Sequence, residues 1–174
     1  MQLPLAKNLK RNSEELSLGK SGKDIADIIA PPPVIYGGLI LLGVLFHWLY
    51  PWPVLTSFLK STSIGGGIII FGFLLLAWSM AYFIIKRTPV DPYHPTKAII
   101  TSGPYRFSRN PVYIALSLIH MGTGIGLQNG WILLLFIPAI LIIHHGVIIR
   151  EEIYLERKFG EAYLTFKNAT RRWL

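Results

Sequence analysis

Two clusters of polar side chains interrupt a chain that is otherwise strongly apolar. The first, in the stretch SGPYRFSRNPVY, contains Arg109 and Asn110 directly before Pro111. The second, in REEIYLERKFGEAY, begins with the adjacent carboxylates Glu151 and Glu152. Arginine and amide donors can bind carboxylates, and paired carboxylates can bind ammonium or hydroxyl groups. Because a charge at the edge of hydrocarbon usually has a partner or a task, both clusters are candidates for a binding pocket.

Each of these residues has a simpler explanation when taken alone. Arg109 could extend to a lipid phosphate while its stem stays in apolar surroundings. The carboxylates could form a solvated helix end, where Glu152 and Glu156 pair with outer basic side chains. These explanations stay open for the single residues. A pocket becomes the better interpretation only if the fold brings the two clusters together.

The elements that follow and precede these clusters require them to be neighbours. Apolar runs from 112 to about 127 and from 131 to about 149 are separated by the turn QNG. A turn this short joins two helices as an antiparallel hairpin. The start of the first helix therefore lies beside the end of the second, about one membrane thickness from the turn.

Composition and two further apolar runs extend this hairpin to a membrane protein. Of the 174 residues, 52% are hydrophobic and only 15% are charged, which is unusual for a water-soluble domain. We predict an all-α integral membrane protein of about four transmembrane helices in two hairpins. Three prolines at 31–33 are expected to stop any preceding helix. The predicted segments are a polar N-terminal arm at 1–33 and a membrane domain at 34–174, with spans at about 34–50, 64–85, 112–127 and 131–149, a loop at 86–111 and an interfacial amphipathic segment at 150–174.

The distribution of basic residues predicts the orientation. Five Lys or Arg lie in the arm, one in the first turn, five between Lys86 and Arg109, none in the QNG turn, and six from Arg150 onward. By the positive-inside rule, both termini and the loop at 86–111 face the cytoplasm. We attribute the net charge of +8 to contact with anionic lipid headgroups, not nucleic acid. The absence of cysteine excludes disulfides and thiolate chemistry.

Histidines and glycines inside the spans are further candidates. His144 precedes Glu151 by seven residues, about two helical turns, so both should share one face with the histidine deeper in the membrane. We expect His144 to line the pocket, and His47, His120 and His145 to hydrogen-bond between helices. No HxxxH spacing supports a metal site, and none is predicted. The glycines of MGTGIG indicate close helix packing, since no strand precedes them as in a phosphate loop.

The stretches PTKAIITSGPYRFSRNPVYIA and HHGVIIREEIYLERKFGEAYLTF, with a closing RRWL, resemble the isoprenylcysteine carboxyl methyltransferase and phospholipid methyltransferase superfamily, in its prokaryotic form. The resemblance covers residues 89–174. The family pattern R-[HN]-P-x-Y falls on Arg109, Asn110, Pro111 and Tyr113. The pattern E-E-x-x-L…F-G-x-x-Y falls on Glu151, Glu152, Leu155, Phe159, Gly160 and Tyr163.

The resemblance implies an S-adenosylmethionine-dependent methyltransferase. In that family the two motifs frame a cofactor pocket that opens to the cytosol, while the acceptor enters from the lipid. Eukaryotic isoprenylcysteine enzymes have histidine in place of Asn110, and often glycine in place of Ala115. Asparagine cannot change charge near neutral pH, so an acid–base task does not pass to it. The implied catalytic residues are Arg109, Asn110 and Glu151, and the implied cofactor-binding residues are Tyr105, Asn110, Pro111, Tyr113, His144, Glu151, Glu152 and Leu155.

Methyl transfer from a sulfonium is an in-line displacement, so the protein must chiefly hold donor and acceptor and exclude water. The acceptor is a membrane lipid or lipophilic small molecule: an isoprenylcysteine-like carboxylate, a lipid amine or a small apolar nucleophile. We expect Glu151 and Glu152 at the ammonium or ribose end of the cofactor, Arg109, Asn110 and Tyr113 at the methionine head or the acceptor, and His144 at either ligand.

Two other functions stay open from the sequence. Sterol reductases that use NADPH resemble this superfamily in their last membrane helices, but their counterpart of the second motif lacks the Glu-Glu pair. A non-catalytic membrane scaffold or lipid-binding protein could keep the fold without turnover. Retention of Arg109, Glu151 and Glu152 favours methyl transfer over both.

Overall fold

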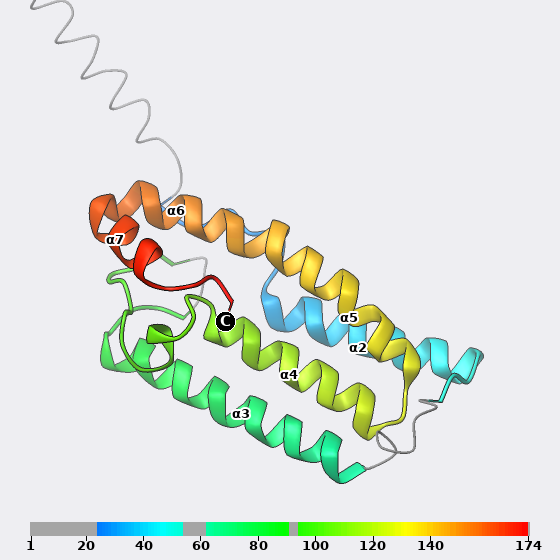
Figure 1. The fold of residues 1–174 in the computed structure, drawn as a ribbon. Coiled ribbons are helices and arrows are strands. Elements are labelled where there is room, and N and C mark those ends of the chain that lie inside the picture. Colours follow the sequence, from blue (N-terminus) through cyan, green and yellow to red (C-terminus); the bar gives the residue numbers. More distant parts are fainter. Residues whose placement is uncertain (1–23, 54–61, 91–93, 174) are drawn as a thin grey trace, which may run out of the picture.

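The computed structural model describes residues 24–53, 62–90 and 94–173. Within these ranges the chain is helical and contains no strand, apart from an isolated bridge between Pro53 and Asn129. The long helices lie side by side in a bundle (Figure 1). They are α2 (Pro32–Leu49), α3 (Thr62–Ile85), α4 (Pro111–Gly126) and α5 (Gly130–Ile143), followed by the π-helical turn η3 (His144–Ile148), α6 (Ile149–Phe159) and α7 (Glu161–Ala169); the short 3₁₀ helix η2 (Gly103–Arg106) precedes α4.

Three of these helical stretches are long and apolar enough to cross a membrane: 32–49, 62–85 and 130–159. The fourth apolar helix, α4, has 16 residues. At about 1.5 Å per residue, α4 is shorter than the roughly 30 Å of a hydrocarbon core. The all-α membrane fold is therefore confirmed, with α4 as a shorter helix among three full-length ones.

Two helix boundaries differ from the expectation. Pro32 and Pro33 begin α2 and do not merely stop a preceding helix, because the first helical turn needs no backbone donor. The helix that carries the fourth apolar run does not end at 149. It continues through α6 to Phe159 as one helical rod of 30 residues, so the first part of the amphipathic segment belongs to the same helix. Gly160, with φ of 53°, then ends the rod.

Other predicted segments fall partly outside the described residues. Most of the N-terminal arm, at 1–23, and most of the first turn, at 54–61, lie there. The loop at 86–111 contains η2 and, apart from the undescribed 91–93, no strand. The division into an arm and a membrane domain stays a prediction.

Glycines set the contact between α3 and α4. A Cβ atom at Gly65 would lie 2.4 Å from the backbone nitrogen of Gly126, and one at Gly122 would lie 2.9 Å from the carbonyl oxygen of Gly65. Two backbones can approach this closely only without side chains between them. The expectation that the MGTGIG glycines serve helix packing is confirmed.

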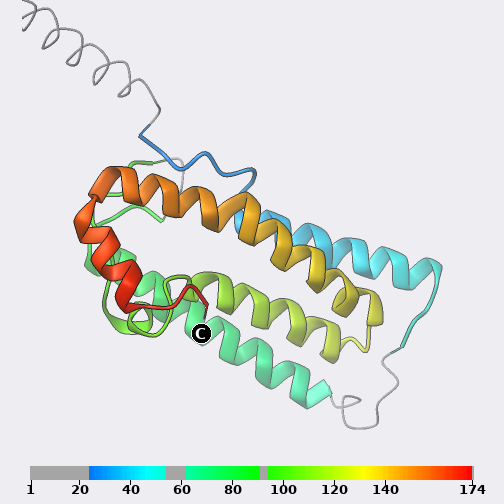
Figure 2. The same ribbon diagram turned by 45° about the horizontal axis from the view of Figure 1, so that its top comes forward.

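Asn129 fixes the hairpin of α4 and α5. Its Oδ1 accepts a hydrogen bond from the backbone N–H of Ile132 at 3.1 Å, which caps α5. Its Nδ2 donates to the carbonyl oxygen of Gly43 at 3.2 Å, so the same side chain joins the turn to α2. The antiparallel hairpin predicted from QNG is present, and it brings the start of α4 beside η3 and α6 (Figure 2).

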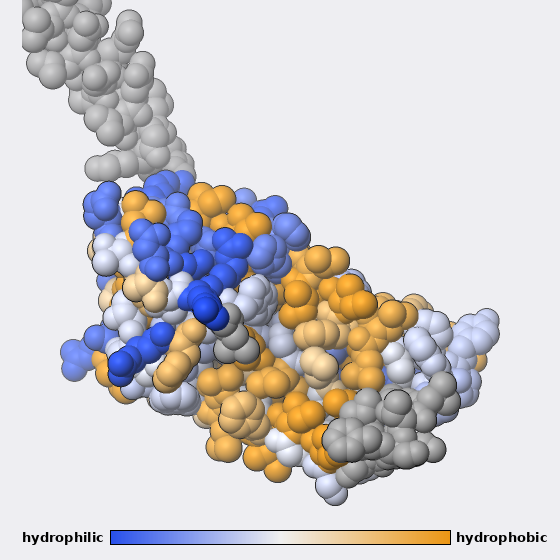
Figure 3. Space-filling view, in the orientation of Figure 1, coloured by the Kyte–Doolittle hydropathy of each residue, from blue (hydrophilic) through white to orange (hydrophobic). Residues whose placement is uncertain are grey.

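Polarity divides the molecule along the bundle axis. Hydrophilic residues gather over α6, α7 and the C-terminal tail, while apolar side chains cover the middle of the bundle (Figure 3). Exposed Leu41, Phe71 and Leu141 lie on three different helices. Large apolar side chains on the outside of a helical bundle suit contact with lipid. The polar end, predicted to face the cytoplasm, contains both motif clusters.

We expect Gly65→Leu to lower the thermal stability of the protein in detergent clearly, because the new side chain meets backbone atoms that cannot rotate away. Overpacking of this kind costs about 1–3 kcal/mol or more. Gly66→Leu is the matched control, since nothing lies within 4 Å of a Cβ atom there. Equal melting temperatures for the two variants would contradict the packing argument.

Candidate active site

A cavity of about 590 Å³ opens at the polar end of the bundle. Ligand pockets typically measure about 300–1,000 Å³, so it can hold a cofactor-sized molecule. One side is apolar and includes Leu76, Met80 and Phe83 of α3. The opposite side carries the polar groups. The predicted site residues that line the cavity are Tyr105, Arg109, Asn110, Pro111, Tyr113, Glu151, Glu152 and Leu155.

Glu151 faces this cavity with one protein partner. The hydroxyl of Tyr113 lies 2.8 and 2.7 Å from its two carboxylate oxygens and donates to them. Among the described residues, no ion pair reaches Glu151. A carboxylate in a mostly apolar cavity without a cation is costly, so the site is suited to receive a positively charged ligand.

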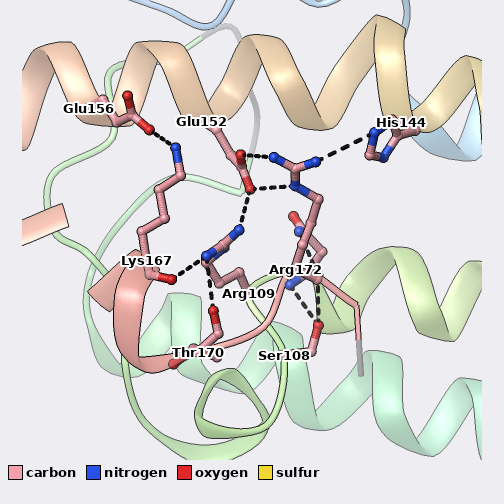
Figure 4. A network of polar contacts seen from close by, with 9 residues as sticks. Ser108, Arg109, His144, Glu152, Glu156, Lys167, Thr170 and Arg172 are labelled. Atoms are coloured by element: carbon pink, nitrogen blue, oxygen red, sulfur yellow. Dashed lines mark hydrogen bonds and ion pairs between the residues drawn. The ribbon is translucent and has the colours of Figure 1, made fainter. Parts of the chain in front are cut away.

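Glu152, next in the chain, has the opposite surroundings. Its Oε1 accepts from Arg109 Nη2 and Arg172 Nε, both at 3.0 Å, and its Oε2 accepts from Arg172 Nη2 at 2.7 Å (Figure 4). The side chain is only 7% exposed. Both oxygens of Glu152 are therefore engaged by arginines from two distant parts of the chain.

The donors of the first motif bind the C-terminal tail. The backbone N–H of Arg109 donates to the carbonyl oxygen of Arg171 at 2.9 Å, and Arg109 Nη1 donates to those of Thr170 and Lys167. Asn110 Nδ2 donates to the carbonyl oxygen of Arg172 at 2.9 Å. These groups, expected to meet a ligand, hold the tail against the start of α4.

Two buried polar atoms at the cavity have no hydrogen-bond partner among the described residues. They are the hydroxyl of Tyr105 and Nε of Arg109. Buried polar atoms nearly always have a partner, which is then a ligand or a water. Burial, with the nearby charge of Glu151 as a second cause, raises the pKa of Tyr105, so its hydroxyl is a donor. With Glu151, these atoms form the part of the site that the protein leaves available.

His144 is the predicted site residue that does not line the cavity. Its Nε2 lies 3.5 Å from Arg172 Nη1, and its ring stacks on Trp173 with centroids 6.5 Å apart. The reason is η3: a π-helical turn contains more residues than an α-helical one, so a spacing of seven no longer returns to the same face. His144 contacts the tail instead of facing the cavity beside Glu151.

The other histidines behave as expected or pack locally. His120 is fully buried, and its Nε2 lies 2.9 Å from the carbonyl oxygen of Ile132, so it joins α4 to α5. His145 packs edge-on against His144, and His47 Nδ1 accepts from the backbone N–H of Trp52 at 3.4 Å. Over the described residues, no three His, Cys, Asp or Glu side chains cluster as metal ligands do.

The sequence matches a known protein family. The sequence model of the family described as phospholipid methyltransferase matches residues 61–162, more than half of the chain. The chain belongs to the phospholipid methyltransferase family. It is also similar to an uncharacterized protein of Haemophilus influenzae, with 43% identity over 63 residues, which are 36% of this chain and all of that protein. No solved structure matches. Membership indicates methyl transfer at a membrane.

Two segments outside the family match contribute to the site, one by lining the cavity and one by contacting its polar residues, and the sequence analysis predicted neither contact. The first is 24–33, which contributes Ala26 and the three prolines to the lining. Lys158 Nζ binds Asp24 at 2.7 Å and lowers the pKa of that carboxyl group. Tyr154 also donates to Asp24, and Arg150 donates to the carbonyl oxygen of Asp27. The apolar residues of the segment DIADIIA, at 24–30, were the sequence feature that could have predicted this contact.

The second missed segment is the tail with Arg172. The sequence contains two adjacent arginines at 171 and 172, and nothing in their spacing distinguishes the one that turns inward. Arg172 is 33% exposed at its side chain and meets Glu152, whereas Arg171 is exposed. Only the path of the chain after α7 determines which of the two arginines turns inward.

We expect the two adjacent glutamates to differ in their effect on stability. Glu152→Gln leaves Arg109 without its anionic partner. Breaking a fully buried ion pair costs about 3–5 kcal/mol, and somewhat less is expected here because Arg172 is partly exposed. Glu151→Gln removes a carboxylate that neutralises no cation, so its melting temperature should stay equal or rise. Thermal unfolding in one detergent compares them, and a larger loss for Glu151→Gln would refute the assignment.

Proposed function

We propose that this chain is an S-adenosylmethionine-dependent methyltransferase that acts at the cytoplasmic membrane face on a lipophilic acceptor. The observation that carries the proposal is one cavity with two unlike sides. Glu151, without a cation partner, faces the polar side, and apolar side chains of α3 line the other. A cationic cofactor and an apolar acceptor can therefore meet in the same space.

The donor set fits the cofactor. S-adenosylmethionine carries a sulfonium and an ammonium cation, a carboxylate, ribose hydroxyls and an adenine ring. Glu151 supplies a carboxylate for a cation, and the rings of Tyr105 and Tyr113 can face a cation as well. The unpartnered hydroxyl of Tyr105 and Nε of Arg109 supply donors for carboxylate or ribose oxygens.

The residues of this chain act by positioning. When bound, S-adenosylmethionine supplies a methyl group on a positively charged sulfur. Glu151 would hold the ammonium or ribose end of the bound cofactor, and Tyr113 fixes the Glu151 carboxylate through its hydroxyl. Arg109 and Asn110 act by anchoring the tail beside the cavity, since Arg109 Nη1 donates to the carbonyl oxygen of Thr170 and Asn110 Nδ2 donates to that of Arg172. Positioning and exclusion of water supply most of the rate in such a displacement.

The apolar side of the cavity supports a lipophilic acceptor. Leu76, Met80 and Phe83 of α3 line it together with Leu116 of α4, and α3 also carries exposed apolar residues, such as Phe71 and Leu74. Because lipid tails are as apolar as these side chains, an acyl or prenyl chain could pass from the bilayer into this side of the cavity without entering water. Carboxylate, amine and other small nucleophilic headgroups are all compatible with this side.

The decisive assay is transfer of tritiated methyl from S-adenosylmethionine into a lipid extract, followed by identification of the labelled product. Calorimetry on the purified protein measures cofactor binding beside it. A methyltransferase binds S-adenosylmethionine and labels a lipophilic product. Binding of NADPH would indicate a reductase instead, and binding of neither would indicate a scaffold.

We expect Glu151→Gln to weaken S-adenosylmethionine binding by about tenfold or more, because a charge-assisted contact in a desolvated site contributes roughly 1.5–3 kcal/mol. Glu161→Gln, which removes the same charge from an exposed position at the start of α7, is the control and should bind normally. Unchanged calorimetric affinity in Glu151→Gln would show that this carboxylate does not hold the cofactor.

A further inference from the structure

We propose that Arg172, in the tail after α7, is a positioning residue of the active site. By binding Glu152 it leaves Glu151 as the carboxylate that a cationic ligand meets. The inference rests on the proposed function for its ligand, but Arg172 itself lies outside the family match, which ends at 162. It also explains why the tail contacts Arg109 and Asn110 of the first motif: these contacts hold Arg172 beside Glu152.

The cavity wall contains two adjacent carboxylates, and a cationic ligand would be attracted to both. Arg109 and Arg172 engage all the oxygens of Glu152 within 3.0 Å. Arg172 binds it in the two-pronged manner that suits guanidinium and carboxylate. Without Arg172, Oε2 of Glu152 would lose its partner and face the cavity as a second negative site. The contact between Arg172 and Glu152 therefore determines how many negative groups face the cavity and which carboxylate a cationic ligand meets.

The tail backbone is fixed at the same place. The carbonyl oxygen of Arg172 accepts from Ser108 Oγ at 3.1 Å and from Asn110 Nδ2 at 2.9 Å. Ser108 Oγ also accepts from the backbone N–H of Asn110. The side chain of Arg172 thus binds α6, and its main chain binds the residues before α4. Arg172 therefore fixes the distance between α6 and the start of α4 (Figure 4).

The flanking residues limit where Arg172 can move. Trp173 stacks on His144, and Arg172 Nη1 faces the same imidazole at 3.5 Å. Arg109, held by Glu152 and by two tail carbonyls, closes the other side. The tail thus packs on the imidazole of His144, which η3 turns away from the cavity.

The experiment compares Arg172→Gln with Arg171→Gln, because both remove one positive charge from neighbouring positions and only the first breaks the bridge. S-adenosylmethionine affinity is measured by calorimetry on folded protein, beside the melting temperature. We expect affinity about tenfold or more weaker in Arg172→Gln and within about twofold of wild type in Arg171→Gln. Arg172→Lys keeps the charge without the two-pronged contact and should restore part of the affinity.

Coupling to Glu152 separates positioning from a general loss of stability. In a Glu152→Gln background, Arg172→Gln should weaken affinity by less than about twofold further, since the partner is already gone. A variant Arg172→Gln that melts lower but binds as wild type would overturn the inference and leave the proposed function standing. Full additivity of the two substitutions in binding would also overturn it.

A readout without cofactor keeps the inference testable if the proposed function fails. The backbone N–H of Arg109 donates to the tail carbonyl of Arg171, so its hydrogen exchange reports tail docking. We expect faster exchange around 108–110 in Arg172→Gln than in Arg171→Gln. If wild type binds no S-adenosylmethionine, the proposed function is overturned, and equal exchange in the two variants would then overturn the positioning by Arg172 as well.

Discussion

The buried carboxylate of Glu152, held between two arginines, is the constraint on which the polar end depends. Arg109 comes from the start of α4, Glu152 from α6 and Arg172 from the tail, so one ion cluster joins three segments. A carboxylate that is 7% exposed needs such partners, because its desolvation is otherwise uncompensated. Arg109 is in turn oriented by backbone carbonyl oxygens, and Arg172 lies beside the imidazole of His144, so the cluster is held from both sides.

The opposite end of the bundle determines where that cluster can form. Asn129 caps α5 and binds α2, and Gly65 with Gly122 lets α3 approach α4 until the backbones touch. These contacts leave little freedom for the helices to slide. Since α4 and the rod from α5 to α6 are joined by a turn of a few residues, their register at the turn fixes which residues meet at the polar end. Packing in the lipid-facing half thus positions groups in the polar half.

Sequence alone predicted the parts that depend on short-range rules. The three-residue turn forced Arg109 and Glu152 to the same end, and the glycines of MGTGIG predicted close packing. His144 does not line the cavity because η3 changes the number of residues per turn locally, which the apolar sequence around it does not indicate. Arg172 was missed because a tail contact depends on how the chain returns after Gly160. Local periodicity predicts which residues share a helix face. It does not predict the path of a segment without periodicity, such as the tail after α7.

Glu151 and Glu152 are neighbours in the chain, and this determines the directions in which their carboxylates point. Consecutive residues on a helix point about 100° apart, so two neighbouring carboxylates at a helix end cannot both face one ligand in the same way. Here Glu152 turns to the arginines, and Glu151 turns to the hydroxyl of Tyr113 and the cavity. Glu152 thereby serves the structure as the partner of two arginines, while Glu151 stays available to a ligand. Because the anchored carboxylate immobilises the helix turn that bears its neighbour, the available charge is held in place without a cation of its own, and a ligand cation can take that position.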